Sequence, residues 1–177
     1  MNNYGFTFIE LIISIAILSI IFVLIGTVLD LGFEATENGE QTLNTLQRGQ
    51  YLINKITSEV REGSGILDIN KIKDINKSKY RDNFGFVILN QEKEKFILYY
   101  RENRYNRIKR ATAENIKGKS IKASNFLGHN IIGNYVKKIN NNGLNKENKI
   151  INLRISIKNK RSIINFNKDI SVQCSIK

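Results

Sequence analysis

An uncharged run of 19 residues near the N-terminus constrains this chain more than any other feature. Residues 11–29 (LIISIAILSIIFVLIGTVL) contain no Asp, Glu, Lys or Arg and consist mainly of Ile, Leu, Val and Phe. A helix of that length covers about 28 Å, which is close to the thickness of the hydrocarbon layer of a bilayer. The run therefore predicts a helix that spans a membrane.

Two other interpretations of this run fit less well. A cleaved secretory signal has a basic segment before a short apolar stretch, with small residues at the cleavage site. Here only five residues precede Phe6, and none of them is basic. A helix buried in a soluble domain would need more apolar partners than the remaining chain provides. The orientation in the membrane has little support from charge, because the first basic residue is Arg48.

The distribution of charge divides the chain into two parts. Residues 1–62 have a formal charge of −4, whereas residues 63–177 carry +16, which gives the total of +12. Such a contrast indicates two segments in different surroundings. One Cys and one His exclude a disulfide framework and argue against a metal centre. The sequence also lacks a recognisable nucleophile–base pair and a phosphate-binding glycine loop, so we expect no enzyme activity, cofactor or metal.

Glu10 is the unusual residue at the start of the apolar segment. A carboxylate among apolar side chains is costly inside a membrane. One interpretation places Glu10 near the helix N-terminus, where the helix dipole favours negative charge and the side chain can reach the interface. The other interpretation gives it a positive partner from another chain, because no basic residue is close to it in this sequence.

The hexapeptide GFTFIE at residues 5–10, followed by the apolar run, resembles the processing signal of type IV pilins and type II secretion pseudopilins. In that family a prepilin peptidase in the membrane cuts after the Gly and N-methylates the next residue. The resemblance implies cleavage between Gly5 and Phe6 and methylation of Phe6. It also implies that Glu10 acts in assembly by pairing with the Phe6 amino group of a neighbouring subunit. Such a pair, formed where water is scarce, favours one register between stacked helices.

The match to this family has three departures. The leader MNNYG lacks the Lys or Arg that commonly precedes the cleavage site. Phe8 stands where Leu is usual, which is a conservative change. The Pro that many major pilins have within the helix is absent, because the chain contains no Pro.

The resemblance also implies partners and a location. The partners are the prepilin peptidase, other pilin or pseudopilin subunits, the assembly platform of the inner membrane, and membrane lipid. The chain would cross the cytoplasmic membrane once, with its C-terminal domain outside the cytoplasm. After processing it would enter a pilus or a pseudopilus.

Four segments are predicted along the chain: a leader at 1–5, a transmembrane and assembly helix at 6–30, its amphipathic continuation at 31–62, and a β-rich globular domain outside the cytoplasm at 63–177. The continuation is predicted by apolar residues at helical spacing, namely Leu43, Leu46, Ile53, Ile56 and Val60. Gly63-Ser64-Gly65 predicts the end of the helix. A break in its middle stays open because of three residues that weaken a helix, Gly32, Gly39 and Gly49.

The C-terminal part shows the pattern of strands. Residues 83–89 and 95–101 predict a hairpin, residues 104–109 a third strand, and residues 149–158 and 162–172 a later pair. Apolar residues alternate with polar ones along 150–158, which predicts one face on a core and one in water. Residues 140–145 predict a disorder-prone loop.

A long N-terminal helix packed on a mostly antiparallel sheet, an α+β fold, is the pilin architecture. The outline most resembles the J-type minor pseudopilin, and some minor subunits of competence pili share it.

Three further features allow a functional interpretation. Arg and Tyr gather at residues 99–110, as basic and aromatic residues do in grooves for single-stranded nucleic acid. The alternative is two adjacent strands with a charged face toward solvent. The residues that would contact nucleic acid are Arg101, Arg104, Arg107 and Arg110. We expect His129 to be structural or at the surface, and Cys174 to be a small buried hydrophobic residue.

We therefore expect a structural subunit of a pilus or pseudopilus that serves secretion or DNA uptake. One alternative is a minor subunit of a competence pilus whose basic domain binds DNA. Another is a signal-anchored extracytoplasmic domain that is unrelated to pili and keeps its N-terminus uncleaved.

Overall fold

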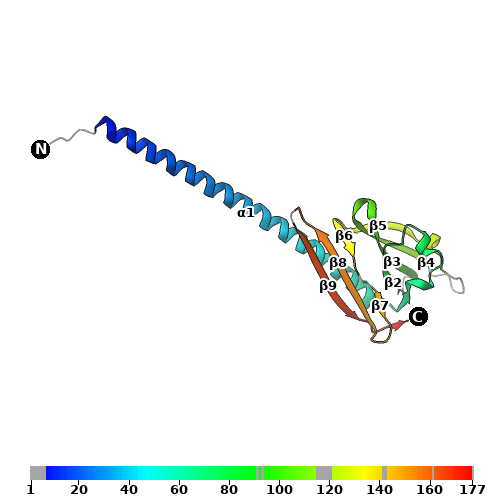
Figure 1. The fold of residues 1–177 in the computed structure, drawn as a ribbon. Helices are drawn as coiled ribbons and strands as arrows, with labels where there is room; N and C mark the ends of the chain where they lie inside the picture. Colours follow the sequence, from blue (N-terminus) through cyan, green and yellow to red (C-terminus); the bar gives the residue numbers. More distant parts are fainter. Residues whose placement is uncertain are drawn as a thin grey trace. The chain divides into compact units, whose positions relative to one another are not determined.

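The computed structural model describes residues 7–90, 92, 94–114, 121–140, 143–160 and 162–176. The chain forms two compact units, Met1–Thr42 and Leu43–Lys177. One helix, α1 (Phe8–Glu62), provides the described structure of the first unit and continues into the second, which also contains all the described strands (Figure 1). The predicted combination of a long N-terminal helix with antiparallel strands, an α+β fold, is confirmed.

The helix ends where the sequence predicts. Glu62 is its last residue, and Gly63 follows at a point where the chain passes close to the sheet. A Cβ at Gly63 would lie 2.7 Å from the Cγ2 atom of Ile88, so this close approach requires a glycine. A break in α1 was left open at three of its glycines, Gly32, Gly39 and Gly49, and all three lie in continuous helix.

The amphipathic stripe in the second part of α1 is confirmed in part. Ile53, Ile56 and Val60 are buried as predicted, and Leu52 is fully buried with them. Leu43 is instead 61% exposed and Leu46 36% exposed. The stripe therefore begins later than its apolar spacing indicates, because the buried positions on α1 start at Thr45 and Gly49.

Six strands form the larger sheet. Their order is β10-β1-β2-β3-β4-β5, and every pair is antiparallel except β1 with β10. The strands are β1 (Gly65–Asp68), β2 (Asn83–Asn90), β3 (Lys95–Glu102), β4 (Arg107–Glu114), β5 (Leu127–Gly133) and β10 (Ser175–Ile176). The predicted hairpin of residues 83–89 and 95–101 is confirmed as β2 and β3.

The second sheet has four strands: β6 (Val136–Ile139), β7 (Gly143–Asn145), β8 (Ile150–Lys158) and β9 (Ile163–Ser171). β9 lies along one edge of β8, while β6 and β7 follow each other along the other edge. The predicted late pair is therefore confirmed as β8 and β9. Ile151, Leu153, Ile155 and Ile157 of β8 are all buried, which confirms the face assigned from their alternation.

Two local predictions need correction. The third strand was expected at 104–109, but a 3-10 turn occupies Asn103–Tyr105 and β4 starts at Arg107. Asn106 closes this turn with φ of 51°, a left-handed conformation that Asn tolerates well. The predicted loop at 140–145 contains β7, which pairs with the first residues of β8. Residues 141 and 142 of that loop lie outside the described residues.

The six-stranded sheet is buried on both faces. On one face Phe84, Phe86 and Ile88 of β2 pack with Leu52 and Ile56 of α1, and the apolar residues of β8 complete this core. The opposite face carries a second core, in which strand residues pack under loop residues that include Ile72, Ile75, Tyr80 and Phe126. Burial on two sides explains why β2 reads as a continuous apolar run instead of an alternating one.

Candidate functional site

The structure describes the predicted processing region from Thr7 onward. Gly5 and Phe6, the residues of the expected cleavage site, lie outside the described residues. α1 begins at Phe8, and the preceding Thr7 interacts with Glu10. The Thr7 backbone N–H and the Thr7 hydroxyl each donate a hydrogen bond to Glu10 Oε2 at 2.8 Å. The Glu10 backbone N–H lies 3.4 Å from Thr7 Oγ1, so the two residues cap the helix start reciprocally.

The capping geometry explains how a carboxylate fits at the start of an apolar helix. Its negative charge lies in the first turn, where the free backbone N–H groups and the helix dipole favour it. This agrees with the local interpretation of Glu10. Both bonds from Thr7 reach Oε2, so Oε1 takes part in neither of them.

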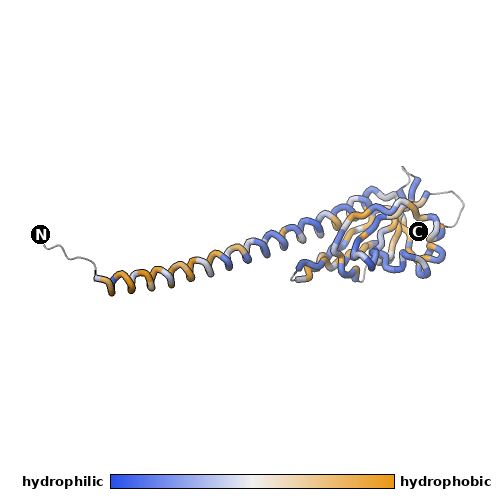
Figure 2. The backbone as a smooth tube through the Cα atoms, turned by 90° about the horizontal axis from the view of Figure 1, so that it is seen from above, coloured by the Kyte–Doolittle hydropathy of each residue, from blue (hydrophilic) through white to orange (hydrophobic). Residues whose placement is uncertain are grey.

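The helix behind Glu10 is apolar on all sides. Its large side chains are exposed throughout, from Phe8 at 78% through Phe22 at 65% to Leu29 at 55%. Figure 2 shows the hydrophobic colour along this part of α1 and its replacement by polar colour further on. By length and composition, α1 is a candidate for crossing a membrane.

The few polar side chains in this apolar part bond to the helix itself. The hydroxyl of Ser14 donates to the carbonyl of Glu10, and that of Ser19 donates to the carbonyl of Ile15, each at 2.8 Å. Thr27 donates in the same way to the carbonyl of Leu24 at 2.8 Å. Each hydroxyl therefore finds its acceptor without water, as a bilayer interior demands.

The four arginines of the predicted nucleic-acid cluster have different surroundings. Arg101 forms an ion pair with Asp82 at 2.8 Å and donates to the carbonyl of Val136 at 2.9 Å. Its side chain is 15% exposed, so it joins the start of β2 to β6. Arg104 and Arg107 both lie over the ring of Tyr105, at 5.5 and 5.1 Å from its centroid.

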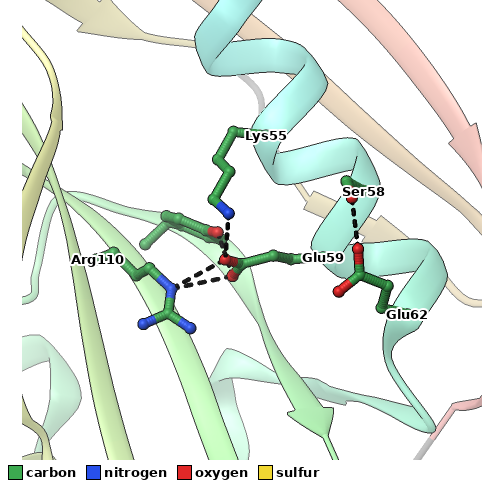
Figure 3. A network of polar contacts seen from close by, with 6 residues as sticks. Lys55, Ser58, Glu59, Glu62 and Arg110 are labelled. Carbon is green, nitrogen blue, oxygen red and sulfur yellow. Dashed lines mark hydrogen bonds and ion pairs between the residues drawn. The ribbon is translucent and has the colours of Figure 1, made fainter.

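Arg110, the fourth of these arginines, points to α1. Its Nε atom donates to both carboxylate oxygens of Glu59, at 3.1 and 3.0 Å (Figure 3). The hydroxyl of Tyr99 donates a short hydrogen bond to the same carboxylate, and Lys55 lies 3.4 Å from it. Two of the four arginines thus hold parts of the domain together, while Arg104 and Arg107 remain near the surface around Tyr105.

The network around Glu59 was not predicted from the sequence. Glu59 is only 8% exposed, and its carboxylate receives bonds from residues on two different strands. Burial and the hydrogen bond to Glu59 raise the pKa of Tyr99 well above its usual value, so this phenol stays protonated as the donor. One feature of the local sequence indicates that Glu59 is buried: it lies between Ile56 and Val60 of the buried stripe.

His129 and Cys174 are placed by the second unit. His129 is in β5, where its imidazole lies between Lys79 at 2.9 Å and Tyr100 at 3.3 Å. Cys174 lies between β9 and β10, is partly buried and packs against the main core, which agrees in part with the predicted buried residue. Burial raises the pKa of its thiol. Within the described ranges, His, Cys, Asp and Glu side chains form no group of three or more that could hold a metal ion.

Comparison with known proteins identifies the N-terminal region. Residues 1–26 match the family model described as the prokaryotic N-terminal methylation motif. Comparison with curated proteins and with solved structures gave no significant match. The motif and the exposed apolar helix that continues it indicate a membrane-anchored pilin-like subunit that is processed by a prepilin peptidase. With this motif at its N-terminus, one long apolar helix and a β-rich domain behind it, the chain fits the family of type IV pilins and type II secretion pseudopilins.

Proposed function

We propose that this chain is a minor structural subunit of a type IV pilus or of a type II secretion-like pseudopilus. The observation that carries the proposal is the methylation motif at residues 1–26, which runs into an exposed apolar helix. A helix that is apolar on all sides needs lipid before assembly and other apolar helices after it. Both surroundings fit a subunit that moves from a membrane into a filament.

In this proposal the peptidase cuts between Gly5 and Phe6 and methylates the new amino group of Phe6. The chain is then the substrate of an enzyme and has no catalytic role of its own. Removal of the leader places a positive amino group on Phe6, at the start of the apolar helix and four residues before Glu10. This amino group is the cation that the chain otherwise lacks near Glu10, because its first basic side chain is Arg48.

Glu10 then selects the register between subunits. Two opposite charges attract strongly where water is excluded, and an unpaired charge there is costly. A neighbouring helix that brings its Phe6 amino group to Glu10 is therefore favoured over neighbours in other registers. The capping bonds from Thr7 support this role, because they fix the carboxylate in the first turn before a partner arrives.

The globular domain would make the contacts with sibling subunits. Its formal charge of +16 over residues 63–177 favours partners with acidic surfaces. Among minor subunits, we propose the J-type pseudopilin as the nearest in outline. Co-purification of the assembled tip from the native host, followed by identification of its subunits, tests this assignment. The presence of secretion pseudopilins supports it, and the presence of competence pilins alone contradicts it.

Mass spectrometry of the mature N-terminus tests the proposed processing. The chain should begin at methylated Phe6 in cells with the prepilin peptidase and at an unprocessed N-terminus in cells without it. A Gly5→Val variant, which places a branched side chain at the cleavage site, should keep its leader in both strains. An unprocessed wild-type N-terminus in both strains would contradict the proposal and indicate the unrelated signal-anchored domain.

A further inference from the structure

A shallow depression of about 520 Å³ opens on the second unit, beside the loop core of the six-stranded sheet. It forms where the 3-10 turn Ile75–Lys77 and the residues after it meet a second turn, Ala123–Asn125, and the start of β5. Its lining combines an apolar wall with two lysines, two serines, one imidazole and one carboxylate: Lys77, Lys79, Ser78, Ser124, His129 and Asp74. None of these residues takes part in the proposed assembly.

Aromatic rings form the base of the depression. Tyr80 is 2% exposed and packs edge-on against Tyr100 with ring centroids 4.9 Å apart. Phe126 and His129 each lie 5.9 Å from the Tyr80 ring. The Tyr80 hydroxyl donates to the carbonyl of Phe126 at 2.8 Å, which ties the two sides of the depression together. The base is therefore fixed by packing and by hydrogen bonds.

The hydrogen bonds of His129 define the protonation of its ring. Lys79 Nζ lies 2.9 Å from His129 Nε2, and an ammonium group can only donate, so Nε2 carries a lone pair. The proton of the neutral ring is then on Nδ1, which lies 3.3 Å from the Tyr100 hydroxyl. Burial and the charges of Lys79 and Lys109 lower the pKa of His129, and Glu102 opposes them in part.

Positive charge at this depression has little local compensation. Lys77 and Lys79 are both exposed, and Asp74 is the single carboxylate among the lining residues. Lys79 contacts an imidazole and lies 5.4 Å from the centroid of the Tyr80 ring. Neither of these partners is a carboxylate, whereas Arg101 and Arg110 are paired with carboxylates elsewhere in the domain. An anion is the partner that would complete the site.

We propose that this depression binds a phosphate or carboxylate group that is attached to a sugar ring. The anion would lie between Lys77 and Lys79 and receive a further hydrogen bond from protonated His129. The sugar would rest on the apolar wall, where Leu127 is 69% exposed, with the hydroxyl groups of Ser78 and Ser124 at its rim. Sugar phosphates and uronic acids share this chemistry. The proposal is independent of the role in pilus assembly.

Binding of the anion and protonation of His129 should strengthen each other. An anion next to the ring favours the imidazolium form, and it draws the Lys79 ammonium away from Nε2, which frees that nitrogen for a proton. The other titratable groups near the ring are Lys109, Glu102, Tyr80 and Tyr100. Linkage then requires that the anion binds more tightly at pH values below the pKa of His129.

The experiment uses the single histidine of the chain as its probe. The full chain, labelled with ¹³C and ¹⁵N at His, purified without a histidine tag and held in neutral detergent micelles, gives one set of imidazole NMR signals. A pH titration is recorded in NaCl, inorganic phosphate, glucose 6-phosphate, glucuronate and glucose at matched ionic strength. We expect glucose 6-phosphate or glucuronate to raise the proton affinity of His129 about fivefold to tenfold over NaCl. The larger of the increases in glucose 6-phosphate and in glucuronate identifies phosphate or carboxylate as the preferred group.

Two variants complete the test. Lys79→Gln should abolish the increase in proton affinity, while Lys168→Gln, at an exposed lysine on β9 of the other sheet, should leave it unchanged. Both side chains are exposed, so both variants are expected to fold. The same proton affinity in all five solutions, or an equal increase in Lys79→Gln, would overturn the proposal. Inorganic phosphate and glucuronate could also raise the proton affinity of His129 by general charge attraction. In that case Lys168→Gln would lose the increase as well, and this result would overturn the proposal.

Discussion

The two parts of α1 use similar apolar residues in opposite ways. In the first unit Ile20 and Leu24 are 62% and 58% exposed, whereas Leu52 and Ile56 in the second unit are fully buried. The difference lies in the arrangement of the residues around the helix. Residues 11–29 are apolar on every side of the helix, whereas the part from Thr45 to Val60 has one apolar stripe that packs on the strands. Apolar content alone therefore does not decide whether a helix packs on its own domain.

Glu10 and Glu59, one in each part of α1, differ in where their hydrogen-bond partners lie in the sequence. Glu10 is bonded by Thr7, three residues away, whereas Glu59 is bonded by Tyr99 and Arg110, which are 40 and 51 residues away. Glu59 therefore joins α1 to β3 and β4, while the bonds from Thr7 hold Glu10 within the first turn of α1. This contrast predicts that substitution of Glu10 changes assembly and that substitution of Glu59 changes stability.

The largest expected effect follows Glu10→Ala. This variant should insert and be cleaved normally, yet its incorporation into the filament should be lost, because the Phe6 amino group of the neighbouring subunit has no counter-charge. The measurement is the amount of mature variant in sheared filaments compared with the amount in membranes. Normal incorporation of the variant would refute the Phe6–Glu10 pair.

The next effect concerns the buried stripe. Ile56→Ala should lower the free energy of unfolding by about 3 kcal/mol, because it removes a fully buried side chain and leaves a cavity. Ile17→Ala, at a residue that is 54% exposed in the first unit, should leave that free energy unchanged. Both can be measured by urea unfolding of the full chain in neutral detergent, with tyrosine near-UV circular dichroism as the signal. Equal losses of unfolding free energy in the two variants would contradict the conclusion that Ile56 packs on the strands and Ile17 does not.

A smaller effect is expected at the polar network. Glu59→Ala should lower the free energy of unfolding by about 2 kcal/mol, since it leaves Tyr99 and Arg110 without their buried acceptor. Glu62→Ala is the matched control: Figure 3 shows Glu62 one turn nearer the helix end, where Ser58 bonds it at the surface. Its removal should change little. The same unfolding measurement applies, and equal losses in both variants would show that the network contributes nothing specific.

Local sequence was sufficient for the features that depend on neighbouring residues. The motif at residues 5–10, the apolar run, the helix end at Gly63 and the two main strand pairs all follow from residue order over short stretches. Two short strands, β1 and β10, were missed because Gly65–Asp68 and Ser175–Ile176 hold too few residues to show a period. In β5 the sequence LGHNIIG has a glycine near each end, which argues against a strand.

The polar sites could not be predicted because their members are distant in the sequence. Glu59 resembles the other charged residues of α1 until β4 brings Arg110 to it. The same fold also gives Arg101 an internal partner, Asp82, although its sequence neighbours favoured a surface role. The depression around His129 combines residues from three segments, and nothing in the sequence around His129 indicates its lysine partner, Lys79, which lies 50 residues away.

The smallest expected effect compares one substitution in the two units. A Cβ at Gly49 would lie 2.1 Å from the Phe166 ring, so Gly49→Ala should lower the free energy of unfolding by about 1 kcal/mol, even after the gain in helix propensity. A Cβ at Gly39 meets nothing within 4 Å. Gly39→Ala should therefore leave the free energy of unfolding of the second unit unchanged. It should also help the helix to keep more of its circular dichroism signal at 222 nm as the temperature rises. If both alanines act alike, the helix does not pack on β9 at Gly49, and the buried stripe must begin nearer to Leu52.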